Sequence, residues 1–137
     1  MSAQTSSSTA PATTSSLNAG LIWFDGRIVP EAEATVSVLT HALHYGTSVF
    51  EGIRAYETDR GAAVFRLREH SERLLASAKI LGMPTEWAAD DVDRAILETI
   101  RANERASCYV RPLLWYGAES LGVNPGRNKL QIGRAHV

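Results

Sequence analysis

The sequence predicts an α+β domain in which two helices accompany an antiparallel sheet. Strand patterns fall within residues 22–67 and 107–116, and two helical patterns lie between these regions. Short turns separate the first strands, which is typical of antiparallel hairpins. The regular alternation of strand and helix that builds a parallel sheet is absent from the pattern, so the fold class is α+β.

Residues 1–20 are predicted to form a disordered tail. They are mostly Ser, Thr and Ala and contain no Lys or Arg, so they lack the apolar content needed to fold. They also lack the basic start and apolar centre of a secretory signal and the arginine-rich composition of a transit peptide. We therefore expect the cytoplasm as the location.

The folded part is expected to begin with a hairpin of residues 22–24 and 27–29. Asp25 and Gly26 join the two strands, and this dipeptide accepts the positive φ angles of a tight turn. Residues 58–61 read TDRG and predict a second turn. Residues 63–67 then form the returning strand, so the core of the domain is antiparallel.

The strand expected at residues 49–56 alternates two sets of side chains and has a mixed face. Alternation places Val49, Glu51, Ile53 and Ala55 on the first face and Phe50, Gly52, Arg54 and Tyr56 on the second. Gly52 leaves a gap beside the aromatic residues, as expected where a ligand or another chain approaches the backbone closely. A half-buried edge strand is the alternative interpretation.

Two helices follow this part of the sheet. The first is expected at residues 68–81 and ends at Gly82 and Pro84; its apolar stripe consists of Leu67, His70, Leu74, Ala78 and Leu81. The second is expected at residues 90–103, with Asp90 or Asp91 as its N-cap. Its buried positions recur at four-residue steps and are Val92, Ile96 and Ile100.

The last expected strand covers residues 107–116. Alternation places Tyr109, Arg111, Leu113 and Trp115 on one face. A phenol and a guanidinium then stand side by side next to apolar surface, which makes this face a candidate acceptor for an amino acid. Pro112 cannot donate to a strand ladder, so an edge position or a bulge is expected there.

Composition narrows the range of functions. The 137 residues are 45% hydrophobic and 21% charged, which suits one globular domain with a core. A net charge of −1 gives no electrostatic footprint for nucleic acid. No apolar run approaches the roughly 20 residues of a membrane-spanning helix. We expect neither nucleic acid nor a membrane as a partner.

Cysteine and histidine give little sign of a metal site. Cys108 is the single cysteine, which excludes an internal disulfide, and its apolar strand context predicts a buried, inert thiol. His41 and His44 have helical spacing, but no third ligand is near, and zinc sites use three or four protein ligands. We expect no metal, and we expect both histidines to pack and form hydrogen bonds.

Three motifs together resemble one enzyme family. Residues 41–54 read HALHYGTSVFEGIR, residues 65–74 read FRLREHSERL, and residues 109–113 read YVRPL. In this combination they resemble the N-terminal part of branched-chain amino-acid aminotransferases, which are fold-type IV pyridoxal-phosphate enzymes. The likeness runs from about Ile22 to Pro125. It implies that residues 21–125 form the small N-terminal domain of such an enzyme.

The resemblance also sets an expectation for the end of the chain. Family members continue after residue 125 with a strand, a link and a second domain, so we expect a fragment with a divergent end at residues 126–137. Residues 132–137 read IGRAHV and match one reading frame of a common sequencing adapter. An adapter-derived end is therefore a hypothesis.

The resemblance implies pyridoxal 5'-phosphate as the cofactor. It assigns Arg73, within the REHxxRL motif of residues 68–74, to the cofactor phosphate. From the helical pattern alone, an ordinary surface ion pair between Glu69 and Arg73 is the alternative. The Schiff-base lysine of the family lies in the second domain, and neither Lys79 nor Lys129 matches it. We therefore expect the fragment itself to be inactive.

The resemblance also implies the substrate contacts. Arg111 would grip the side-chain carboxylate of glutamate, and Tyr109 would help to hold the α-carboxylate. The remaining assigned residues are Tyr45, Phe50 and Gly52 in the side-chain pocket, Arg54 near the site, and Tyr45 with Val123 at the partner subunit's site. Such a site requires a homodimer. For Arg54, an ion pair with Glu51 or another carboxylate is the alternative.

The expected function is transfer of an amino group between leucine, isoleucine or valine and 2-oxoglutarate. The partners are then small amino acids and 2-oxo acids. Two alternatives within the same fold are D-amino-acid aminotransferase and aminodeoxychorismate lyase, which residues 45–54 fit less well. A different class of protein, a non-enzymatic domain that binds a partner through Phe50, Tyr56 and Trp115, remains a further alternative.

Overall fold

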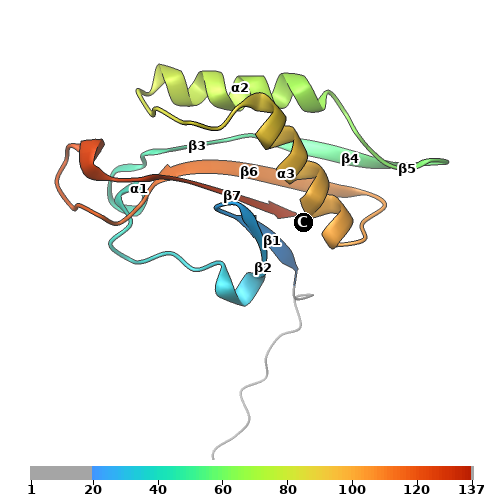
Figure 1. Ribbon diagram of the computed structural model, residues 1–137, viewed down its shortest axis with the longest axis horizontal. Helices are drawn as coiled ribbons and strands as arrows, with labels where there is room; N and C mark the ends of the chain where they lie inside the picture. Colours follow the sequence, from blue (N-terminus) through green and yellow to red (C-terminus); the bar gives the residue numbers. More distant parts are fainter. Residues whose placement is uncertain (1–19, 137) are drawn as a thin grey trace, which may run out of the picture.

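A seven-stranded antiparallel sheet forms the base of the molecule, and two long helices pack on one face of it (Figure 1). The computed structural model describes residues 20–136. The strands are β1 (Leu21–Phe24), β2 (Arg27–Pro30), β3 (Ser48–Phe50), β4 (Ile53–Thr58), β5 (Gly61–Val64), β6 (Cys108–Tyr116) and β7 (Leu130–His136). Their order is β2-β1-β7-β6-β4-β5, with β3 also paired to β6. The predicted fold class is confirmed.

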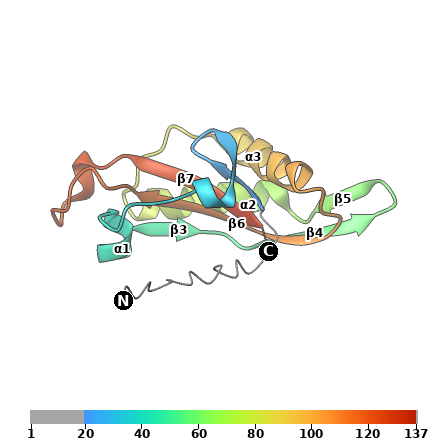
Figure 2. The same ribbon diagram turned by 90° about the horizontal axis from the view of Figure 1, so that it is seen from below.

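Three helices and two short 3-10 turns complete the chain. The helices are α1 (His41–Tyr45), α2 (Leu67–Ile80) and α3 (Ala89–Ala102), and the 3-10 turns are η1 (Glu31–Glu33) and η2 (Pro125–Arg127). Figure 2 shows the molecule from below, with α2 behind the sheet and with η1 and the segment that leads to α1 crossing in front of it. The side of the sheet turned away from α2 is called the open face; residues 34–43 cover part of it. The tail predicted for residues 1–20 lies outside the described residues, apart from Gly20.

The first hairpin forms as predicted and also anchors the C-terminal strand. Asp25 and Gly26 have φ angles of 43° and 98°, the left-handed values that this turn requires. The Asp25 carboxylate accepts a hydrogen bond of 2.8 Å from the Ile132 amide, and the Asp25 amide donates to the Ile132 carbonyl at 2.9 Å. The turn residue therefore ties β1 to β7, a strand that the sequence does not predict.

β6 is the central strand, so the edge position or bulge expected at Pro112 is wrong. β6 pairs with β7 on one side and with β3 and β4 on the other. The same register links Phe50 to Leu113 and Ile53 to Val110, so no residue is inserted between them. Pro112 accepts the Glu51 amide at 3.0 Å but has no N–H to return. That missing bond coincides with the gap between β3 and β4.

The two faces of residues 49–56 alternate as predicted, although the strand is divided in two. Val49, Glu51, Ile53 and Ala55 are all buried towards the helices. Phe50, Arg54 and Tyr56 are exposed on the open face. β4 lies between β5 and β6, so it is not an edge strand, whereas β3 pairs only with β6.

The return strand is shorter than expected, and the helix begins earlier. The sequence predicts a strand over residues 63–67, but β5 ends at Val64 and α2 starts at Leu67. Arg66 precedes the helix with a φ of 48°, a left-handed conformation that a strand cannot continue through. The turn at residues 65–66 therefore directs the chain from the sheet into α2.

The predicted stripe of α2 is correct except at its end. Leu74 and Ala78 are buried, and Leu67 packs against the core. Leu81 is exposed because the helix ends at Ile80 and Leu81 is already the C-cap. Gly82 follows with a φ of 64°, as expected for a glycine that ends a helix.

The N-terminus of α3 is stabilised differently from the prediction. The N-cap is Ala88, not Asp90 or Asp91. Asp91 instead reaches back from the first turn, and its carboxylate accepts the Ala88 amide at 3.0 Å. A carboxylate in this position also favours the positive end of the helix dipole. The predicted burial of Val92, Ile96 and Ile100 is confirmed.

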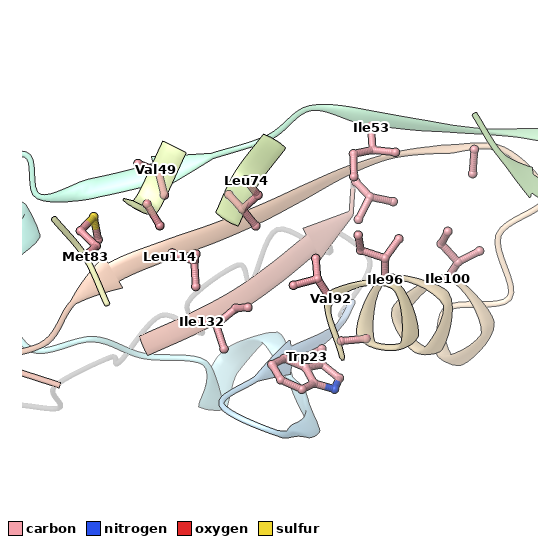
Figure 3. Close-up of a cluster of buried hydrophobic side chains, with 14 of the residues drawn as sticks. Trp23, Val49, Ile53, Leu74, Met83, Val92, Ile96, Ile100, Leu114 and Ile132 are labelled. Carbon is pink, nitrogen blue, oxygen red and sulfur yellow. The ribbon is translucent and has the colours of Figure 1, made fainter. Parts of the chain in front are cut away.

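The core lies between the sheet and the two long helices (Figure 3). Leu74 of α2 and Ile96 of α3 are completely buried against Ile53, Leu114 and Ile132 of the sheet. Trp23 from β1 closes one end, and its indole nitrogen donates to Glu98 of α3 at 3.2 Å. Within residues 20–136, no helix has the length and apolar character to cross a membrane.

Candidate functional site

The open face carries one compact group of polar and aromatic side chains. Tyr109, Arg111 and Leu113 point away from the helices, because Val110, Pro112 and Leu114 between them are buried in the core. The register places Phe50 beside Leu113 and Arg54 beside Tyr109. The face predicted from alternation is therefore confirmed, and it joins residues from β3, β4 and β6.

Arg111 is held between two aromatic rings. Its Nε and Nη2 atoms donate to the phenolic oxygen of Tyr109 at 3.1 and 2.8 Å. Its guanidinium carbon lies 4.4 Å from the centre of the Phe50 ring and 5.2 Å from that of Tyr109. A cation in this position is attracted by each ring face. Its second edge, which carries Nη1, stays available to an anion. We call Phe50, Gly52, Tyr109 and Arg111 the Arg111 cluster.

Gly52 gives Tyr109 the space that it occupies in this cluster. A β-carbon at position 52 would overlap the phenolic oxygen of Tyr109 and would lie 3.1 Å from two carbons of its ring. The predicted gap beside the backbone is therefore real, and the ring of Tyr109 fills it in this structure. The absence of a side chain at position 52 places the phenol where Arg111 can reach it.

Arg73 lies on the helical side of the sheet and is paired with Glu51. Arg73 Nε and Nη2 donate to the two Glu51 carboxylate oxygens, each at 2.6 Å. His70 Nδ1 lies 2.9 Å from one of these oxygens. The alternative pair of Glu69 with Arg73 is wrong, because the helix directs Arg73 at the sheet and Glu69 approaches Arg66 at 3.7 Å.

The charges in this group support one another. Burial works to raise the pKa of Glu51, but the hydrogen bonds from Arg73 and His70 outweigh it, and the pKa falls below its ordinary value. The hydrogen bonds to Glu51 in turn raise the pKa of Arg73. We call Glu51, His70 and Arg73 the Glu51 triad. It is an ionised pair with a histidine alongside.

Residues 50–52 connect the Arg111 cluster to the Glu51 triad. Phe50 points to the open face under Arg111, and Glu51 points to the helices and binds Arg73. β3 pairs only with β6, so among residues 20–136 no strand covers its outer edge. A ligand lying along this edge would meet the Arg111 cluster on one side and the Glu51 triad on the other.

Arg54 stands apart from both groups. It is exposed on the open face, and its guanidinium carbon lies 5.9 Å from the centre of the Tyr56 ring. The alternative ion pair of Arg54 with Glu51 is wrong, because Arg54 lies on the open face of the strand and Glu51 on the buried face. Arg54 and Tyr109 stand opposite each other in the pairing of β4 with β6.

Tyr45 and Val123 lie outside the Arg111 cluster, in a unit formed by α1 and residues 121–123. The phenol of Tyr45 donates to the Leu121 carbonyl at 3.1 Å. His41 is fully buried. Its Nε2 forms a hydrogen bond with the Gly122 carbonyl at 3.0 Å, and its Nδ1 forms one with the Thr47 hydroxyl at 2.8 Å. These bonds hold α1 and residues 121–123 together, while Val123 itself is 77% exposed.

The histidines bind protein groups, as predicted. Both ring nitrogens of His41 have partners, and His44 Nε2 lies 2.9 Å from the Val38 carbonyl. Among the described residues, no group of three or more His, Cys, Asp or Glu side chains could hold a metal. Cys108 is buried, and burial raises the pKa of its thiol, which agrees with an inert cysteine.

An apolar cavity of about 320 Å³ opens beside Arg111. Arg111 supplies its cationic wall, and apolar side chains of β1, α1 and β6 supply most of the rest. The lining residues are Ile22, Phe24, Ala34, Val36, Thr40, Ala42, Leu43, Ser48, Arg111, Leu113, Trp115 and Gly133. The open face therefore combines one fixed cation with an apolar surface, which suits a ligand with a carboxylate and an aliphatic part.

Comparison with known proteins gives the class to which this arrangement belongs. The chain matches the family described as amino-transferase class IV over residues 48–132. This stretch contains β3, β4, β5, β6, the start of β7 and both long helices. The chain belongs to the class IV amino-transferase family.

Within this family the similar proteins are branched-chain-amino-acid aminotransferases. The enzyme of Pseudomonas aeruginosa is 43% identical over 113 residues, which cover 82% of this chain and 37% of that protein. The enzyme of Escherichia coli K12 is 50% identical over 107 residues, with 78% and 35% covered. The chain thus spans little more than a third of the length of these relatives.

A solved structure shows the same similarity in three dimensions. The branched-chain amino acid aminotransferase of T.th., in complex with N-(5'-phosphopyridoxyl)-L-glutamate, superposes with a TM-score of 0.83 and 55% identity. The match covers 87% of this chain and 40% of that chain. The sheet and helices described above correspond to the small N-terminal domain of a fold-type IV aminotransferase.

Proposed function

We propose that the whole protein containing this chain is a branched-chain amino-acid aminotransferase with pyridoxal 5'-phosphate as its cofactor. It would move an amino group between leucine, isoleucine or valine and 2-oxoglutarate, and this chain would form its small domain. The names of the similar proteins support this proposal. The observation that carries it is Arg111, held over Phe50 and bonded to Tyr109.

Arg111 is proposed to bind the distal carboxylate of glutamate and 2-oxoglutarate. Tyr109 takes one edge of its guanidinium, so the opposite edge can form a paired hydrogen bond with a carboxylate. Phe50 and the apolar cavity wall suit aliphatic side chains. This combination explains how one pocket accepts both a dicarboxylate and a branched aliphatic substrate. We propose that Tyr109 also helps to hold the α-carboxylate.

Arg73 is proposed to bind the phosphate of the cofactor. Glu51 occupies the edge of the guanidinium formed by Nε and Nη2. Glu51 does not bind the edge formed by Nη1 and Nη2, although Nη2 also lies 3.4 Å from His70 Nδ1. The Arg73 side chain is 65% exposed. A guanidinium with a free edge fits a phosphate group. When bound, pyridoxal phosphate supplies the electron-withdrawing ring that makes amino transfer feasible.

The lysine that bonds the cofactor is proposed to lie outside this chain. Lys79 is exposed on α2 and lines a separate cavity with Met83 and Trp87, on the helical side of the sheet. Lys129 is exposed beyond η2. Neither lysine belongs to the Arg111 cluster, which would hold a substrate. This chain then binds and orients the reactants, and another part of the protein supplies the lysine.

A homodimer is proposed for the whole protein. Tyr45 and Val123 lie on a protruding unit whose exposed apolar residues include Val38 and Leu43, and exposed apolar patches mark interaction surfaces. Tyr45 and Val123 would reach the partner subunit's site in this arrangement.

Arg54 and Gly52 remain candidate substrate contacts. A cytoplasmic location stays a prediction from the sequence.

Kinetics of the complete gene product test this function. The complete reading frame would be expressed, and amino transfer to 2-oxoglutarate would be measured with leucine, isoleucine, valine and D-alanine as donors. We expect activity with the three branched L-amino acids and little with D-alanine. Activity with D-alanine alone would favour a D-amino-acid aminotransferase. Failure to bind pyridoxal phosphate would contradict the proposal and favour the non-enzymatic alternative.

A further inference from the structure

We infer that Glu51 is a positioning residue that sets the orientation of Arg73 for phosphate binding. This inference rests on the proposed function, because it takes Arg73 as the phosphate ligand. Glu51 itself would touch neither cofactor nor substrate. Its effect would pass entirely through the guanidinium that it holds.

The geometry of the pair leaves one orientation for Arg73. The two Glu51 oxygens bind Nε and Nη2 at 2.6 Å each, a fork-to-fork contact that fixes the plane of the guanidinium. The free edge must then face away from Glu51 and out of the fold. Because the Arg73 side chain is 65% exposed, burial does little to order it. Glu51 therefore provides most of its order.

Glu51 is well placed to serve as a fixed support. Its side chain is only 6% exposed. Its amide donates to Pro112 on the central strand at 3.0 Å, so its backbone belongs to the rigid part of the sheet. His70 holds one carboxylate oxygen at 2.9 Å. The carboxylate is thus restrained from the strand, from α2 and by Arg73 itself.

An ordered guanidinium binds an anion more tightly than a mobile one. A free arginine side chain loses rotational freedom when it binds, and that loss weakens the complex. Glu51 removes this loss before the phosphate arrives. Its negative charge also offsets part of the attraction between Arg73 and the phosphate, so the orienting effect must exceed this offset. If ordering is the larger effect, removal of the Glu51 charge weakens phosphate binding. If the charge offset is larger, removal strengthens it.

A purely structural role for Glu51 is the alternative. The pair connects α2 to the sheet, so its loss could loosen the domain and weaken every ligand equally. An orienting role is different, because it affects only ligands that carry a phosphate. The comparison of a phosphorylated ligand with its unphosphorylated counterpart separates the two roles.

The test uses the apo form of the complete gene product and two probes, pyridoxal phosphate and pyridoxal. Dissociation constants would be measured for the wild type, Glu51→Gln, Arg73→Gln and the double variant. We expect Glu51→Gln to raise the dissociation constant of pyridoxal phosphate by about 10- to 100-fold, the range for one charge-assisted hydrogen bond. Pyridoxal should bind it as it binds the wild type. The double variant should bind pyridoxal phosphate no more weakly than Arg73→Gln alone.

Glu69→Gln is the matched control. Glu69 is exposed and lies on α2, as Arg73 does, but its carboxylate approaches Arg66 and not Arg73. It should leave both dissociation constants unchanged. If Glu51→Gln does not fold, Glu51→Asp takes its place. Its side chain keeps the negative charge but is too short to bind both Nε and Nη2 of Arg73. It should show the same phosphate-specific loss.

Three results would overturn the inference. These are an equal loss for both probes in the Glu51 variant, tighter binding of pyridoxal phosphate, or losses that add in the double variant. A wild-type protein that binds neither probe would overturn the proposed function instead. A phosphate-specific loss in Arg73→Gln without one in Glu51→Gln would overturn only the role of Glu51.

Discussion

The phenol of Tyr109 lies where the side chain of residue 52 would stand, so the two positions are sterically linked. A β-carbon on Gly52 would overlap the phenolic oxygen and lie 3.1 Å from two ring carbons. The same oxygen accepts both hydrogen bonds from Arg111. A methyl group at position 52 must therefore move the acceptor that orients Arg111.

We predict that Gly52→Ala leaves the fold intact and impairs the proposed dicarboxylate reaction of the complete gene product. The ring of Tyr109 can rotate away from the new methyl group, but Arg111 then loses its acceptor, and a bond of this type is worth about 1.5–3 kcal/mol. The kcat/KM for glutamate should fall by about tenfold or more. Steady-state kinetics and a thermal melt would measure both effects.

Gly122→Ala is the control for this prediction, because a β-carbon there would meet its nearest neighbour at an ordinary 3.7 Å. Its melting temperature should match that of the wild type. Wild-type kinetics in Gly52→Ala would show that Tyr109 does not orient Arg111.

Alternation along a strand could be predicted from sequence, because it needs only the period of two. The buried set of Val49, Ile53 and Ala55 and the open-face set of Tyr109 and Arg111 follow from it directly. Both sets are correct despite the break between β3 and β4. Local periodicity is sufficient here because each face of the sheet has a uniform environment.

The partner of Arg73 could not be predicted in the same way. Glu51 and Arg73 are separated by 22 positions, and their contact depends on how α2 docks on the sheet. Helical spacing indicates Glu69 instead, because it identifies neighbours only within one helix. One signal pointed to Glu51: it is the single charged residue on an otherwise apolar strand face. A buried charge requires a partner.

The position of β6 in the sheet was also inaccessible from sequence. Pro112 indicated an edge, since proline removes a ladder bond. The structure tolerates it in the centre because its missing N–H falls opposite Glu51, at the point where β3 gives way to β4. Strand order depends on contacts between distant segments, including β7, which no pattern before residue 125 predicts.

We predict that Ile96→Ala strongly destabilises the 137-residue chain. Ile96 is completely buried between α3 and the sheet, so the substitution removes apolar contacts and leaves a cavity. The expected loss is about 2–5 kcal/mol in the free energy of unfolding. Urea denaturation followed by circular dichroism would measure it.

Ile80→Ala provides a control with the same chemical change, because Ile80 is 83% exposed at the end of α2. Its effect should stay within about 0.5 kcal/mol. Similar losses for the two variants would contradict the placement of the core between α3 and the sheet.

We predict that Glu51 stabilises the fold at neutral pH and stops doing so in acid. Although burial opposes it, the hydrogen bonds from Arg73 and His70 lower the pKa of Glu51 below its ordinary value of 4.5. A lowered pKa means that the folded state holds the carboxylate in its charged form more strongly than the unfolded state does. The stabilisation is therefore complete above the ordinary pKa and is lost as the pH falls through the folded one.

Urea denaturation of the wild type and of Glu51→Gln across this pH range would measure the effect. The difference in unfolding free energy should be constant at neutral pH and should shrink below the ordinary pKa. His70 also contacts Glu51, so the comparison would be repeated in a His70→Asn background. A difference that does not change with pH would mean that the carboxylate is not held in its charged form by the fold.

We predict that the 137-residue chain alone forms no specific covalent adduct with pyridoxal phosphate. Lys79 and Lys129 are exposed, and neither belongs to the Arg111 cluster or to the Glu51 triad. Mass spectrometry after borohydride reduction would detect any adduct on a lysine. A stoichiometric product on Lys79 would mean that this chain supplies the lysine that bonds the cofactor. Lys79→Arg is the variant that would confirm such a product.

We predict that Arg111→Gln in the complete enzyme separates the two half-reactions. Arg111 is proposed to contact the distal carboxylate of glutamate and no part of leucine or valine, so its loss should weaken the glutamate half-reaction selectively. One charge-assisted hydrogen bond of about 1.5–3 kcal/mol corresponds to a loss of about tenfold to somewhat over a hundredfold in kcat/KM. Single-turnover kinetics with glutamate and with leucine would measure each half-reaction.

Arg54→Gln is the matched control, because Arg54 is also an exposed arginine of the open face but does not contact Phe50 or Tyr109 in the way Arg111 does. It should discriminate less between glutamate and leucine than Arg111→Gln does. Equal losses for both substrates in Arg111→Gln would mean that Arg111 supports the whole site. In that case the cation held over Phe50 would stabilise the open face without selecting the dicarboxylate, and the basis for dual substrate recognition would lie outside this chain.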